Sequence, residues 1–159
     1  MSQGCEPNES DETMFQTAEA TAALSTCVRR QVGAVLVDRQ GAVRAVGFNQ
    51  EHPTYLSCAV SCPRGRCSYD EVPAGSDYAN GAGSCIAIHA EMMAAGKFNG
   101  RSIEGWTMYV THQPCHDCQE ALDALKVTAK WKEPLYGSDG TGHGHDSPSG
   151  AHGGFPERS

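Results

Sequence analysis

The sequence has little positive charge and no long apolar segment. Its 12 Lys and Arg residues are outnumbered by 19 Asp and Glu residues, which gives a formal net charge of −7. Nonspecific nucleic-acid binding depends on phosphate neutralisation by Lys and Arg, so this balance argues against a nucleic-acid partner. No apolar run approaches the roughly 20 residues of a membrane-spanning helix, and no signal segment is recognisable at the start. We therefore expect a soluble, cytoplasmic protein with no membrane partner.

Aromatic residues make up only 7% of the chain and hydrophobic residues 39%, whereas 18 glycines and 8 prolines indicate sizeable loops or tails. A chain of 159 residues is long enough for one hydrophobic core but short for two. We expect one domain over residues 13–136. The acidic segment 1–12 and the glycine-rich segment 137–159 have compositions typical of disordered tails.

Hydrophobic periodicity predicts a helix over residues 13–28, with Asp11 as its N-cap. Two β-rich runs, 32–37 and 42–48, flank a turn-like segment and predict an antiparallel hairpin. The pattern after residue 85 predicts a helix over 89–97, a strand over 106–111, a helix over 115–124 and a strand over 127–131. This order is that of an α/β domain.

The segment 50–84 has little periodicity, and a loop of this length is uncommon in a compact domain. It contains Cys58, Cys62 and Cys67, which makes a second metal ion a candidate for holding it in place. The spacings of these cysteines are looser than those of a zinc knuckle. The alternative is that they are unligated thiols in an active-site flap.

Two short motifs carry the chemistry, His89-Ala90-Glu91 and Pro114-Cys115-His116-Asp117-Cys118. Eight cysteines without a secretion signal favour metal ligation or reduced thiols over disulfides. A catalytic zinc takes three protein ligands and leaves its fourth position to water. We therefore predict that His89, Cys115 and Cys118 hold Zn²⁺ and that Glu91 moves protons. Because both cysteines stand at a predicted helix start, we expect the helix dipole to lower both thiol pKa values.

The two motifs lie 22 residues apart and resemble the signature of the zinc-dependent cytidine deaminase superfamily. Four stretches are most similar to deoxycytidylate (dCMP) deaminases: 31–35, 47–49, 88–91 and 108–111. The resemblance covers about residues 13–136. It implies a three-layer α/β/α cytidine-deaminase-like fold with a central mixed β-sheet of about five strands, and a homo-oligomer.

The resemblance also implies an activity. The expected reaction is hydrolysis of dCMP to dUMP and ammonia, by zinc-hydroxide attack at C4 with Glu91 as the proton shuttle. Asn49, Ala90 and Pro114 are the expected substrate-binding residues. Alternatives are a nucleoside, a free base, another amino-heterocycle, or a base within single-stranded DNA or tRNA. A non-enzymatic zinc module, in which Glu91 would be idle, is a further class.

Some viral members of the superfamily carry a second, structural zinc ion in the flap. By resemblance, Cys27 would bind it with two or three of Cys58, Cys62, Cys67 and Cys85. Arg29, Arg30 and Arg64 are candidates for binding a phosphate group. The sequence after Asn49 departs from the family pattern, in which a glycine and a small residue commonly precede the proline.

Overall fold

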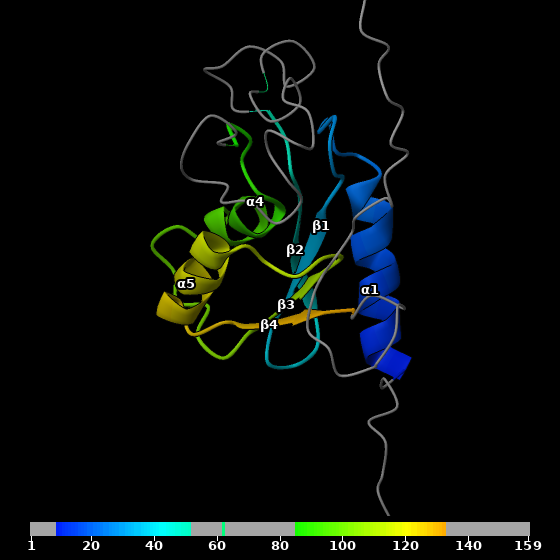
Figure 1. Ribbon diagram of the computed structural model, residues 1–159. Coiled ribbons are helices and arrows are strands. Elements are labelled where there is room, and N and C mark those ends of the chain that lie inside the picture. The colour runs from blue at the N-terminus through cyan, green and yellow to red at the C-terminus, as the bar shows by residue number, and fades with distance from the viewer. Residues whose placement is uncertain (1–8, 52–61, 63–84, 133–159) are drawn as a thin grey trace, which may run out of the picture.

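The computed structural model describes residues 9–51, 62 and 85–132 (Figure 1). The helices within these residues are α1 (Glu9–Ala22), α4 (Ala90–Gly96) and α5 (His116–Ala124). The strands are β1 (Gly33–Val37), β2 (Val43–Phe48), β3 (Thr107–Val110) and β4 (Thr128–Trp131). The predicted elements are all present in the predicted order, with ends that differ by a few residues.

The strands form one mixed sheet in the order β2-β1-β3-β4. Strand β1 is antiparallel to β2 and to β3, and β3 is parallel to β4. The predicted hairpin is thereby confirmed. The described residues contain four strands, against about five expected.

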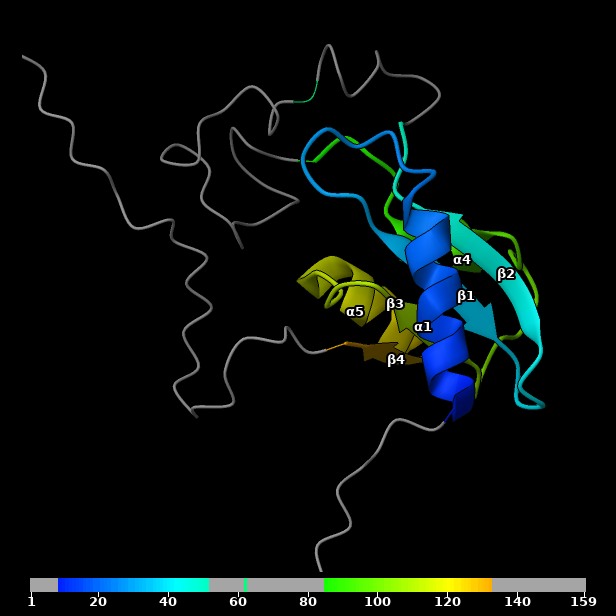
Figure 2. The ribbon, with the colours of Figure 1, turned by 90° about the vertical axis from the view of Figure 1, so that its right-hand side faces the viewer.

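The sheet lies between two helical layers, with α1 on one face and α4 and α5 on the other (Figures 1 and 2). All five residues of β1 are buried, because this central strand is covered on both faces. Its side chains alternate as expected for a strand. Ala34 and Leu36 join the core beneath α4 and α5, whereas Val35 and Val37 pack with Phe15 of α1. The three-layer α/β/α architecture is confirmed.

Two strand glycines allow the helices to approach the sheet closely. A Cβ atom on Gly33 would lie 2.6 Å from the backbone nitrogen of Ala22 in α1. A Cβ atom on Gly47 would lie 2.7 Å from the backbone nitrogen of Ala94 in α4 and would also strike the Ala90 carbonyl. Any larger residue at either position therefore has to displace a helix backbone.

The first helix differs from the prediction at both ends. It begins at Glu9, so residues 9–12 are helical rather than part of a disordered lead-in. Asp11 lies inside α1 and does not cap it, because its carboxylate accepts hydrogen bonds from Tyr109 and Lys130. The helix ends at Ala22 rather than at residue 28, and Leu24, which the periodicity places on the apolar face, is 61% exposed.

The predicted tail 137–159 and most of the predicted flap lie outside the described residues. Within the described part, no helix is long and apolar enough to cross a membrane. Gln50, the first residue of the predicted flap, forms an isolated antiparallel bridge with Ile88, which lies four residues after the flap's predicted end. Each residue donates its backbone N–H to the carbonyl of the other, at 3.1 and 2.9 Å. This bridge lies directly before His89.

Candidate metal centre and active site

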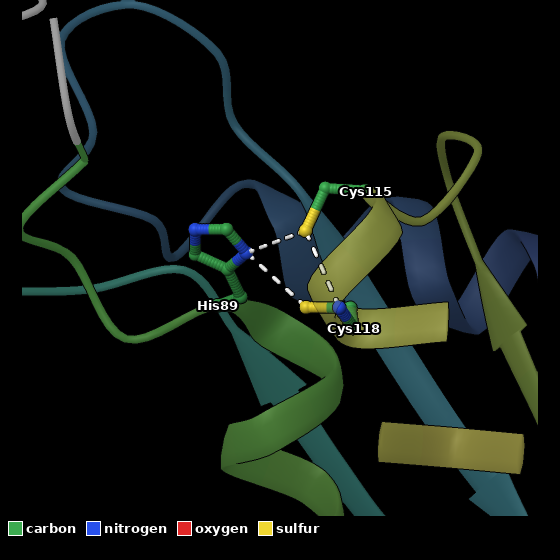
Figure 3. Close-up of side chains that lie close together, drawn as sticks. All are labelled: His89, Cys115 and Cys118. Carbon is green, nitrogen blue, oxygen red and sulfur yellow. Dashed lines mark hydrogen bonds between the residues drawn. The ribbon is translucent and has the colours of Figure 1, made fainter. Parts of the chain in front are cut away.

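Two helix starts carry the predicted metal ligands. His89 is the N-cap of α4 and Cys115 is the N-cap of α5, and both residues have extended backbone. The Cys118 N–H, in the first turn of α5, donates to the Cys115 sulfur at 3.5 Å. The sulfur thus satisfies one of the backbone donors that a helix start leaves unpaired. Because α4 and α5 lie together on one face of the sheet, their first turns place these side chains near one another (Figures 1 and 3).

The three predicted ligands converge on one point. His89 Nδ1 lies 3.2 Å from Cys118 Sγ and 3.4 Å from Cys115 Sγ (Figure 3). All three ligand atoms lie within 4.8 Å of one another. A tetrahedral zinc ion, with bonds of about 2.3 Å to sulfur and about 2.0 Å to nitrogen, separates such atoms by roughly 3.5 Å. One nitrogen and two sulfurs at these separations fit a zinc ion with a remaining open position.

Glu91 lies in the first turn of α4 and is only 4% exposed. Burial raises the pKa of its carboxyl group, which lies close enough to His89, Cys115 and Cys118 for these side chains to influence that pKa. The carboxylate is therefore beside the ligand cluster and shielded from bulk water. An uncoordinated buried carboxyl group at this position suits proton transfer better than metal binding.

The side chains of the cluster shift one another's pKa values. The hydrogen bond from Cys118, followed by that from His89, lowers the pKa of Cys115 to about 4. Cys115 and then Cys85 raise the pKa of His89 to about 10. The Cys115 thiolate instead raises the pKa of Cys118, so the prediction of two lowered thiol pKa values is met by Cys115 and wrong for Cys118.

A cavity of about 300 Å³ opens beside the cluster. Its lining residues come from the segment before α4 and from both helix starts: Ala87, Ile88, His89, Met92, Asp117 and Cys118. A larger hollow of about 610 Å³ runs along α5 and β4, and it contains none of the predicted site residues. The smaller cavity is therefore the one relevant to the metal centre.

Asn49 is 8% exposed and lies next to the Gln50–Ile88 bridge. Its side-chain oxygen accepts the Val32 N–H at 2.8 Å and lies 2.5 Å from Ser25 Oγ. Its amide nitrogen donates to the Arg30 carbonyl at 2.7 Å. The sequence reasoning missed Ser25, because a single serine at a helix end carries no recognisable signal.

The other predicted site residues are distributed as follows. Ala90 and Pro114 are buried beside the metal ligands. Arg30 is exposed, and its charge adds to burial in lowering the pKa of His112, so Arg30 lies near the segment between β3 and α5. Cys58, Cys67 and Arg64 lie outside the described residues.

The described cysteines of the proposed second site do not form a ligand cluster by themselves. Cys27, Cys62 and Cys85 are free of disulfides, and no group that combines these three within 4.8 Å occurs in the described residues. Cys85 instead lies close enough to His89 to contribute to the raised pKa of its ring. Cys27 Sγ accepts the backbone N–H of Arg30, three residues later, at 3.5 Å. Cys115 Sγ accepts the backbone N–H of Cys118 in the same way.

Comparison with known proteins gives one family and several relatives. The family model of the cytidine and deoxycytidylate deaminase zinc-binding region matches residues 8–131. The chain is 41% identical over 118 residues to the deoxycytidylate deaminase of Mycobacterium phage D29, covering 74% of this chain and 88% of that protein. It is 28% identical over 133 residues to a probable deoxycytidylate deaminase of Drosophila melanogaster, covering 81% of this chain and 59% of that protein.

Among solved structures, the dCMP deaminase of cyanophage S-TIM5 in complex with dCMP and dUMP aligns with a TM-score of 0.57 and 28% identity. The alignment covers 80% of this chain and 83% of that one. The apo form of the same enzyme aligns with a TM-score of 0.54 and 25% identity.

Proposed function

Since this chain belongs to the cytidine and deoxycytidylate deaminase family of hydrolytic deaminases, we propose that its substrate is dCMP, which it converts to dUMP and ammonia. The observation that carries the proposal is the convergence of His89, Cys115 and Cys118 beside the buried carboxyl group of Glu91. The 41% identity to a phage deoxycytidylate deaminase and the likeness to an enzyme solved with dCMP and dUMP support this choice of substrate.

His89, Cys115 and Cys118 are the residues that would hold the catalytic zinc ion. Zinc in such a site supplies Lewis acidity, which makes a water molecule a nucleophile at neutral pH. In the overall reaction a C4–O bond forms, the bond from C4 to the exocyclic nitrogen breaks, and the water protons end on the ring and on ammonia.

Glu91 is the proposed proton carrier for these transfers. It lies two residues after His89, in the first turn of α4, and the side chains of His89, Cys115 and Cys118 influence its pKa, so its carboxyl group would be near a water at the cluster. In the proposed mechanism Glu91 takes one proton from the water and gives it to the ring nitrogen. It then takes the second proton from the hydroxyl group now on C4 and gives it to the departing ammonia, so that the carboxyl group ends in its starting state. Its burial keeps bulk water from competing for these protons.

The substrate would be bound by residues around the cluster. Ala90 and Pro114 are both buried next to the metal ligands and would pack against the pyrimidine ring. Asn49 would bind the sugar. Arg30, which is exposed near His112, would pair with the 5′-phosphate, and this charge pairing would favour a nucleotide over a nucleoside.

A second, structural zinc ion is also part of the proposal. Cys27 Sγ accepts a backbone N–H from the third residue after it, as the predicted zinc ligand Cys115 does. The remaining ligands would come from Cys58, Cys62, Cys67 and Cys85. A homo-oligomer stays a prediction, which sedimentation analysis can test.

An ammonia-release assay tests the substrate. The purified zinc-loaded protein is offered dCMP, deoxycytidine, cytidine, cytosine, modified cytosine nucleotides, and adenine and guanine derivatives at equal concentrations. We expect dCMP to give the highest kcat/KM, with deoxycytidine turned over at least about 10-fold less efficiently because it lacks the phosphate. A higher kcat/KM for a nucleoside, a free base or a purine would overturn the assignment to dCMP while leaving a deaminase.

A further inference from the structure

We infer that Ser25 is a positioning residue, which holds the side-chain amide of Asn49 in the orientation that binds the substrate sugar. The inference rests on the proposed function, in which Asn49 contacts that sugar. Ser25 itself contacts neither the ligand cluster nor the cavity beside it, and it would act through Asn49 alone.

The backbone pairing next to Asn49 places this residue near the metal ligand His89. It follows the end of β2 and precedes Gln50, which pairs with Ile88 in an antiparallel bridge. Asn49 stands one residue before Gln50, and His89 stands one residue after Ile88. Neighbours of an antiparallel bridge in this register lie opposite each other. The bridge therefore brings the Asn49 backbone beside that of a metal ligand.

The orientation of the Asn49 amide is defined by fixed donors and acceptors. The Val32 N–H can only donate, so the atom that it meets at 2.8 Å is the side-chain oxygen. The Arg30 carbonyl can only accept, so its partner at 2.7 Å is the amide nitrogen. The nitrogen uses one of its two hydrogens in this way, which leaves one donor for a sugar hydroxyl.

The Ser25 hydroxyl is a further hydrogen-bonding partner of Asn49. Its hydroxyl lies 2.5 Å from the Asn49 side-chain oxygen and 2.7 Å from the Asn49 carbonyl oxygen. The same hydroxyl accepts the Cys27 N–H at 3.1 Å, and the Ser25 carbonyl accepts from the Gln31 side chain at 3.1 Å. The single hydrogen of this hydroxyl can be donated to either oxygen of Asn49, so Ser25, which is 7% exposed, links Asn49 to the segment between α1 and β1.

Removal of the hydroxyl has a specific expected effect. The Asn49 oxygen would keep the Val32 N–H as its donor and the amide nitrogen would keep the Arg30 carbonyl, so the amide would be held by two hydrogen bonds instead of three. Ground-state binding of the sugar would weaken, whereas the zinc ligands and Glu91 would stay in place. For Ser25→Ala we therefore expect KM for dCMP to rise by about 5- to 10-fold, with kcat within about 2-fold of wild type.

The test combines two substrates and a double-mutant cycle. Steady-state kinetics are measured for Ser25→Ala, Asn49→Ala and the double variant, with dCMP and with the dideoxynucleotide that lacks the 3′-hydroxyl. We expect the Ser25→Ala penalty to vanish in the Asn49→Ala background, because both changes remove the same interaction. We also expect Ser25→Ala to discriminate less than wild type between the two nucleotides.

Thr21→Val is the matched control. Thr21 is also a buried hydroxyl residue near the end of α1, but its hydroxyl donates to the Thr17 carbonyl within the helix. The Thr21→Val variant should therefore have the KM of the wild type and the same discrimination between the two nucleotides. If Ser25→Ala does not fold, Ser25→Cys keeps the volume and replaces the hydroxyl by a much weaker hydrogen-bonding group.

Additive effects of the two substitutions, or a Ser25 variant that loses stability with an unchanged KM, would overturn the positioning role. Turnover of dCMP by the wild-type protein is measured first in the same assay. Its absence would refute the proposed function, whereas its presence together with an unchanged KM in both Ser25 variants would refute only the inference on Ser25.

Discussion

His89 Nδ1 lies 3.2 Å from Cys118 Sγ, although the two residues belong to different helix starts and are 29 positions apart in the chain. Nothing local joins them. Their distance is set by how α4 and α5 pack on the same face of the sheet (Figure 1). The separation of the ligand atoms therefore depends on how these two helices pack. A substitution in the sheet beneath either helix should change the geometry of the cluster.

Gly47→Ala should weaken the metal centre from a distance. The added Cβ atom would strike the backbone of α4 at Ala90 and Ala94, so the helix that carries Glu91 and follows His89 has to move. We expect a loss of stability of about 1–3 kcal/mol and a measurable loss of zinc affinity. Chelator competition and thermal unfolding report the two effects separately.

The control for this change is Gly96→Ala. Gly96 is the last residue of α4, and a Cβ atom there would meet nothing within 4 Å. Alanine at this position should leave zinc affinity unchanged and should not destabilise the fold, because alanine favours helix over glycine. Equal zinc affinities for Gly47→Ala and Gly96→Ala would contradict the packing explanation.

Glu91→Gln should separate metal binding from catalysis. Glutamine keeps the shape of the buried side chain but cannot carry the proton. We expect one zinc ion to remain at the cluster and kcat to fall by on the order of 10²- to 10⁴-fold, the range that general acid–base catalysis contributes. Metal analysis and the ammonia-release assay on the same sample give both values, and a kcat near that of wild type would show that another group moves the proton.

Metal content distinguishes one zinc site from two. Cys118→Ala should remove the catalytic zinc and the activity together, because it deletes one of the three clustered ligands. Cys27→Ala should lower the zinc content by about one ion per chain and leave His89, Cys115 and Cys118 occupied. A wild-type value near one zinc per chain, with Cys27→Ala folded and unchanged, would rule out the second site.

The sequence was sufficient to predict that His89, Cys115 and Cys118 lie together, because a zinc site restricts its ligands so narrowly. One imidazole and two thiols at the starts of two predicted helices leave few other arrangements, and the structure brings these three side chains together. The hairpin was equally accessible, since two β-rich runs around Asp38–Gly41 admit one simple pairing, and Gly41 has the positive φ of 84° that suits such a turn.

Long-range polar contacts explain what the sequence did not predict. Periodicity extends α1 to residue 28, but the chain leaves the helix after Ala22 and Ser25 bonds to Asn49, 24 residues away. Asp11 has the identity of an N-cap, yet it binds Tyr109, 98 residues away. Propensity contains no information on such partners, and tertiary hydrogen bonds override it.

The contact between Asp11 and β3 predicts how stability depends on pH. The Tyr109 hydroxyl donates to one carboxylate oxygen of Asp11 at 2.5 Å, and Lys130 donates to the other at 2.9 Å. These two donors, Tyr109 first, hold the pKa of Asp11 below its ordinary value of 3.8. Burial and Asp11 raise the pKa of Tyr109 to about 12, so its hydroxyl stays a donor throughout the acidic and neutral range.

A carboxylate with a lowered pKa in the folded state stabilises that state above the ordinary pKa, and its contribution is lost as the pH falls through the lowered value. Asp11→Asn should therefore reduce the unfolding temperature at pH 7, and the difference from wild type should shrink below about pH 4. Thermal unfolding of both proteins across this range measures the difference, and loss of zinc in acid affects both alike. Glu120→Gln, which changes an exposed carboxylate on α5, should show no such trend. A difference between wild type and Asp11→Asn that stays constant from pH 7 to about pH 2 would mean that the Asp11 charge does not hold α1 to the sheet.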